Sequence, residues 1–157
     1  QDLFKRHHPE NLIVALGTND MSQYVGMLKG SGTFGRSGRQ SRLGAAAGFF
    51  RSTLAVLDQV DFKRCIWVLP PLVNRARFPI DQQNLFYDQL AELIKDRGCE
   101  VIDSRRIVDH SDRDVKSWQE CISDGGSRLY PDVKDQIHFQ KQRGEYWGHC
   151  VALALQK

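Results

Sequence analysis

Short apolar runs that alternate with helix-length amphipathic segments constrain the fold of this 157-residue chain most strongly. The runs at 12–16, 64–69 and 99–104 are rich in apolar and β-branched residues, and glycine, proline or polar residues follow them. Continuous apolar strands of this length are typical of a parallel sheet with both faces covered. The pattern therefore predicts an α/β fold built from βαβ units with right-handed crossovers.

The segments between and after these runs have the apolar spacing of helices. We expect helices at 45–59, 82–97 and 141–155, with Gly98 at the position where a helix commonly ends. The sequence contains no internal repeat and no linker composition. We therefore predict a single domain over residues 1–157.

The segment 29–44 differs from the rest in composition, because it is rich in glycine, serine and arginine. It contains a G-x-G-x-x-G pattern from Gly30 to Gly35, but no clear strand precedes it, which argues against a dinucleotide loop. We predict a flexible surface insertion at 29–44. Its arginines, Arg36, Arg39 and Arg42, offer a site for an anionic ligand or partner.

Composition excludes several classes of protein. The chain is 41% hydrophobic and 26% charged, as globular proteins are, and it has no apolar run of the roughly 20 residues that a membrane helix needs. The net charge of +3 is too small to imply a nucleic-acid partner by itself. No signal peptide is visible, so a cytoplasmic location is favoured. The chain starts at Gln1 and not at methionine, which suggests a processed product or a fragment.

The four cysteines, Cys65, Cys99, Cys121 and Cys150, form no C-x-x-C pair. A zinc knuckle is therefore not expected. Cys65 and Cys99 lie in apolar, strand-like runs. We predict buried free thiols in a reducing compartment, with disulfide formation as the alternative.

Polar residues follow the first apolar run directly. Gly17-Thr18-Asn19-Asp20 comes after the strand at 12–16, and ligands of parallel sheets bind at the carboxyl ends of strands. The carboxamide of Asn19 can donate a hydrogen bond to a developing oxyanion. The alternative is that Asn19 and Asp20 cap a following helix.

A second polar group, Asp135-Gln136-Ile137-His138, precedes the last expected helix. An aspartate three residues before a histidine can accept from its Nδ1–H, which leaves Nε2 free to act as a base. The alternative is an ordinary surface turn.

Together the two groups resemble the SGNH/GDSL hydrolase family, since Gly17-Thr18-Asn19-Asp20 is similar to its G-x-N-D block and Asp135–His138 to its D-x-x-H block. The resemblance implies a flavodoxin-like three-layer α/β/α sandwich and a serine-type ester hydrolase. Asn19 would be an oxyanion donor in a loop supported by Gly17 and Asp20, and His138 the base oriented by Asp135. The expected substrate is a small ester or an acetylated carbohydrate, and no metal or organic cofactor is implied.

The family's nucleophile block, Gly-Asp-Ser, and its glycine block are not found in this chain, and the first strand and helix that carry the nucleophile are missing too. The 16 residues before Gly17 contain neither serine nor glycine. One explanation is that an upstream segment or a second chain supplies the nucleophile. A second is that another serine serves, with candidates Ser31, Ser37, Ser41, Ser123 and Ser127. A third is a catalytically inactive module that binds a protein or an anionic polymer such as nucleic acid.

Overall fold

The computed structural model describes residues 10–15, 50, 54–55, 57–58, 62–73, 78–123, 125–133 and 138–156. Within them, three parallel strands form a sheet in the order β1 (Asn11–Val14), β2 (Arg64–Leu69) and β3 (Glu100–Asp103). Each strand lies within or close to a predicted run, so the mixed α/β class with a parallel sheet is confirmed. The prolines at 70 and 71 follow β2 directly, which is where an interior strand has to end.

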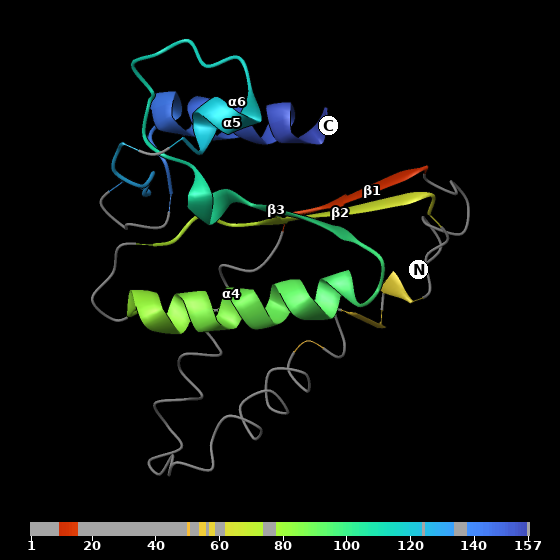
Figure 1. Cartoon of the computed structure of the whole chain (residues 1–157). Coiled ribbons are helices and arrows are strands. Elements are labelled where there is room, and N and C mark those ends of the chain that lie inside the picture. Colours follow the sequence, from red (N-terminus) through yellow and green to blue (C-terminus); the bar gives the residue numbers. More distant parts are fainter. Residues whose placement is uncertain are drawn as a thin grey trace, which may run out of the picture.

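Helices lie on both faces of this sheet (Figure 1). Helix α4 (Ile80–Lys95) covers one face, and α5 (Trp118–Cys121) and α6 (Lys141–Leu155) cover the other. The bounds of α6 are those predicted, while α4 begins and ends two residues before its predicted bounds. The short helix η1 (Ser104–Arg106) and α5 were not predicted. No described helix combines the length and the apolar character that a membrane crossing requires.

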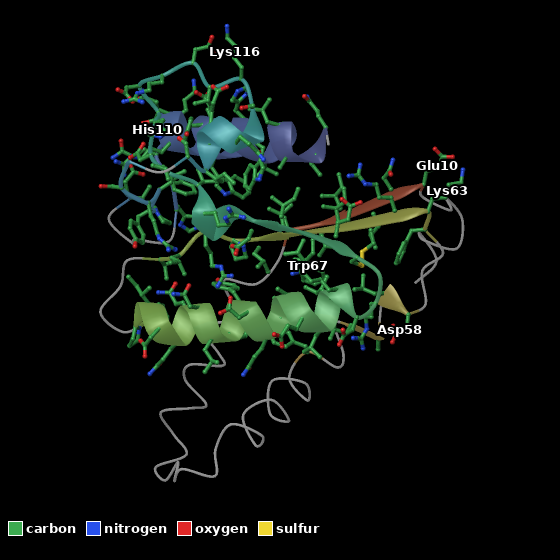
Figure 2. The ribbon with its side chains drawn as sticks, in the orientation of Figure 1. Glu10, Asp58, Lys63, Trp67, His110 and Lys116 are labelled. Carbon is green, nitrogen blue, oxygen red and sulfur yellow. A yellow bond between two sulfur atoms is a disulfide. The ribbon has the colours of Figure 1, made fainter. Side chains whose placement is uncertain are left out.

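Side chains of β2 alternate between two buried clusters. The α4-side cluster contains Cys65, Trp67 and Leu69 together with α4 residues, and Trp67 points from β2 toward α4 (Figure 2). The α6-side cluster contains Ile66 and Val68 together with residues of α6. Both faces of β2 are therefore covered, as expected for an interior strand of a parallel sheet.

The connection from β2 to α4 is fixed by one buried side chain. The Gln83 carboxamide oxygen accepts from the Val73 backbone N–H at 2.9 Å, and its nitrogen donates to the carbonyls of Val73 and Phe78 at 2.8 and 2.7 Å. Gln83 is fully buried, so these bonds replace the water it would otherwise hold. At the other end of α4, Gly98 adopts a φ of 76°, which glycine accommodates without steric cost.

All four cysteines are paired, so the prediction of free thiols is wrong. Cys65 of β2 is bonded to Cys99 just before β3, and Cys121 of α5 is bonded to Cys150 of α6. Parallel packing of β2 and β3 brings the first pair to a Cα–Cα distance of 4.6 Å. Sequence spacing alone cannot report such proximity.

Strand β1 lies at one edge of the described sheet. Leu12 and Val14 pack against the α4-side cluster. Ile13 is in register with Ile66 and faces the α6 side, but its side chain is 52% exposed. Glu10 and Lys63 form an exposed ion pair at the amino ends of β1 and β2 (Figure 2).

Candidate functional site

A cavity of about 210 Å³ lies at the carboxyl ends of β1 and β2, against the start of α6. The described residues of its wall are mostly apolar: Ala15, Val68, Pro70, Pro71, Val73, His138, Phe139 and Trp147. In parallel sheets this edge is the usual location of ligands. The cavity is therefore our candidate site, and its lining includes His138, the histidine that the sequence analysis singled out.

His138 lies on the segment that leads into α6. Its side chain is exposed at the cavity, and its carbonyl accepts from the Val133 N–H at 3.1 Å. Asp132 accepts from the Gln140 N–H at 2.7 Å, which satisfies a donor at the start of α6. These two hydrogen bonds tie the backbone of His138 and Gln140 to Val133 and Asp132, so the position of His138 just before α6 is fixed.

Arg143 anchors the same region to the chain that follows β3. Its guanidinium pairs with Asp109 at 2.7 Å and lies 3.7 Å from Asp132. One turn later, the Tyr146 hydroxyl donates to the Val108 carbonyl at 2.9 Å. Burial raises the pKa of Tyr146 above its ordinary value, so this hydroxyl keeps its proton and serves as a fixed donor.

The other predicted site residues, Gly17, Asn19, Asp20 and Asp135, lie outside the described residues, as does the segment 29–44 with its arginines. Their roles stay predictions. Of the predicted catalytic group, the described residues locate only His138.

The polar residues at the end of β3 hold neighbouring elements together. Asp103 accepts two hydrogen bonds from the Arg105 guanidinium, both at 2.7 Å, and Asp88 of α4 accepts a third at 2.8 Å. Burial alone would lower the pKa of Arg105, but these carboxylates raise it above its ordinary value. The Ser104 hydroxyl donates to the Leu69 carbonyl. This network ties β3 to α4 and to β2.

Two of the alternative nucleophiles, Ser123 and Ser127, can be located, and the other three lie outside the described residues. The Ser123 hydroxyl is 3.5 Å from His110 Nε2, beyond the range of about 2.6–3.2 Å for an activated nucleophile. It also donates to the Glu120 carbonyl at 3.0 Å at the end of α5. Neither serine lines the candidate cavity. The geometry therefore favours a capping role for Ser123.

A larger cavity of about 520 Å³ lies along β3, between α4 and α6. Most of its lining is charged, and several of these charges pair with one another: Arg105 with Asp88 and Asp103, and Glu100 with Arg64 just outside the lining. Charged groups that already pair with one another in this way connect helices and strands, and they do not indicate a ligand-binding site. We therefore place the candidate site at the smaller cavity, where the strand ends and His138 meet.

Sequence reasoning missed two aromatic residues of the site, Phe139 and Trp147. Both pack partly against the α6-side cluster, with ring centroids 6.4 Å apart, and both line the cavity. The Trp147 indole N–H is buried and has no acceptor in the described part of the chain. The sequence shows that both residues are aromatic, but aromatic residues are equally typical of a protein core. No sequence signal therefore distinguished the residues that line the cavity from those of the core.

Comparisons with known proteins give no further assignment. No protein-family model matches the chain, and neither curated proteins nor solved structures give a significant match.

Proposed function

We propose that this chain is the histidine-bearing part of a serine-type ester hydrolase that cleaves carboxylesters or removes acyl groups from a carbohydrate. The observation that carries the proposal is His138 in the wall of an apolar cavity at the carboxyl ends of β1 and β2. In the finer fold that we propose, the described sheet is part of a flavodoxin-like three-layer α/β/α sandwich. The activity requires neither a metal nor an organic cofactor.

In this mechanism His138 acts through its imidazole. It takes the proton of a serine hydroxyl as that oxygen attacks the ester carbonyl, and it returns the proton to the departing alcohol. Asp135 accepts from the imidazole Nδ1–H and keeps the ring in the reactive tautomer. The Asn19 carboxamide donates to the oxyanion of the tetrahedral intermediate.

We propose that the nucleophilic serine comes from outside this chain, from an upstream segment or a second polypeptide. Support comes from β1, which is an edge strand of the described sheet and leaves Ile13 52% exposed on the α6 side. Parallel strands are ordinarily covered on both faces, and an open edge can accept a further strand. A strand and helix added there would bring a residue at its own carboxyl end close to the candidate cavity.

Labelling of the complete natural protein with a fluorophosphonate, followed by peptide mapping, tests the proposal. We expect one labelled serine, located outside residues 1–157. His138→Ala should abolish labelling and lower ester turnover by several orders of magnitude, as the loss of a triad base does. His149→Ala is the matched control, because His149 contacts the Val115 carbonyl at 2.8 Å and does not line the cavity.

Retention of turnover in folded His138→Ala would overturn the assignment of the base. Labelling on a serine within residues 1–157 would reject the external nucleophile and would indicate a rearranged active site that uses a serine of this chain. No labelling of the folded complete protein would favour the alternative, a catalytically inactive module that binds a protein or an anionic polymer.

A further inference from the structure

We propose that the cavity beside His138 binds a linear acyl chain of about six carbons, so that the preferred substrates are medium-chain acyl esters rather than acetyl esters. This inference rests on the proposed function and defines its substrate class. It assigns two lining residues as specificity-determining: Trp147 of α6 and Ala15, which directly follows β1.

The size of the cavity carries the argument. A cavity of about 150 Å³ lined by apolar side chains holds one benzene molecule, which has six carbons. The cavity beside His138 measures about 210 Å³ and is partly open to solvent, so a chain of about six carbons fits against its apolar wall. An acetyl group would fill only a small part of it and would leave much of the apolar wall in contact with water.

The chemistry of the wall agrees with an alkyl occupant. Val68, Pro70, Pro71, Val73 and Phe139 contribute hydrocarbon surface, and the lining residues that the structure describes include no carboxylate, lysine or arginine. A carbohydrate hydroxyl would find few partners there, whereas each buried methylene favours binding roughly fourfold. Among the described lining residues, His138 contributes the polar side chain that faces the cavity.

Binding of unreactive amides by the 157-residue chain tests this inference without the nucleophile. The chain has three tryptophans, so a ¹H–¹⁵N spectrum contains three indole signals, and Trp147→Phe identifies that of Trp147. We expect hexanamide to shift this signal saturably and to bind at least about tenfold more tightly than acetamide, which lacks four methylenes. Equal affinities, or a Trp147 signal that does not respond, would overturn the proposal.

Two alanine variants provide a matched pair. Ala15→Phe fills the cavity from an exposed position at the end of β1 and should abolish hexanamide binding. Ala152→Phe makes the same substitution on the exposed side of α6, away from the cavity, and should leave binding unchanged. Binding that survives Ala15→Phe would place the amide elsewhere.

Failure of this inference and failure of the proposed function give different results. If hexanamide binds as expected but His138→Ala keeps its turnover in the complete protein, the cavity assignment stands and the hydrolase mechanism fails. If His138→Ala abolishes turnover while acetyl and hexanoyl esters react equally well, the mechanism stands and the chain-length preference is wrong.

Discussion

The two faces of the sheet are covered to different extents. On the α4 side, apolar residues of all three described strands pack into one cluster, including Leu12 and Val14 of β1 and Val101 of β3. On the α6 side, the cluster includes residues of β2 and β3, while Ile13 of β1 is 52% exposed. Ile13 and Ile66 are the same residue type in the same register, so their difference in burial comes from position and not from hydrophobicity.

Substitution of these two isoleucines tests the comparison with the largest expected effect. Ile66→Ala should lower the free energy of unfolding by about 3–4 kcal/mol, because Ile66 is 2% exposed and its removal leaves a cavity. Ile13→Ala should lower the free energy of unfolding by less than about 1 kcal/mol, because the Ile13 side chain already contacts water. Urea denaturation of both variants measures the difference.

Equal costs for the two variants would mean that Ile13 is covered in solution. Such a result in the complete protein, but not in the 157-residue chain, would indicate that a further segment packs on β1.

Each cluster contains one disulfide, which allows the two faces to be weakened separately. The sequence separations of 34 and 29 residues are similar, so each bond should stabilise the fold by about 3.5–4 kcal/mol through loop closure. We expect Cys65→Ala/Cys99→Ala and Cys121→Ala/Cys150→Ala to lower the free energy of unfolding by about this amount. Thermal unfolding with and without a reductant provides the measurement.

Amide hydrogen exchange distinguishes the faces in these variants. Loss of Cys65–Cys99 should accelerate exchange chiefly in β2 and β3, and loss of Cys121–Cys150 chiefly in α5 and α6. Thiols that react with alkylating reagents in the untreated, unreduced protein would contradict the observed pairing.

A smaller effect is expected at the amino end of α5. The Ser117 hydroxyl accepts from the Glu120 N–H at 3.2 Å, and the Glu120 carboxylate accepts from the Lys116 N–H at 3.0 Å. Ser117→Ala should cost about 1 kcal/mol at neutral pH, a typical value for the loss of a helix cap. Circular dichroism during urea titration measures this loss.

Acid should reduce the stability that the cap at Ser117 and Glu120 provides. The Lys116 N–H and the Ser117 hydroxyl hold the pKa of Glu120 below its ordinary value. Stability from this carboxylate is therefore complete above an ordinary glutamate pKa of about 4.3 and is lost as the pH falls through the lowered pKa of the folded state. The difference between wild type and Ser117→Ala should shrink below about pH 4. A difference that grows in acid would exclude this explanation.

Helix α5 also illustrates what sequence reasoning overlooked. Ser117-x-x-Glu120 is a capping-box pattern, but a helix of four residues has too little length to produce apolar periodicity. In contrast, α6 was predicted with its observed bounds because its fifteen residues repeat the apolar spacing several times. In the candidate site, His138 was identified from its spacing to Asp135, whereas Trp147 was not, because nothing in a sequence separates an aromatic cavity wall from an aromatic core.

The sequence by itself determined the α/β class, the three described strands and the long helices α4 and α6. These follow from local patterns of apolar and polar residues, which act over a few turns or a few strand positions. Tertiary structure alone decided the pairing of the cysteines, the exposure of Ile13 and the cavity beside His138. Each of these depends on which distant segments come within a few ångströms, and that distance is set by packing of the whole chain.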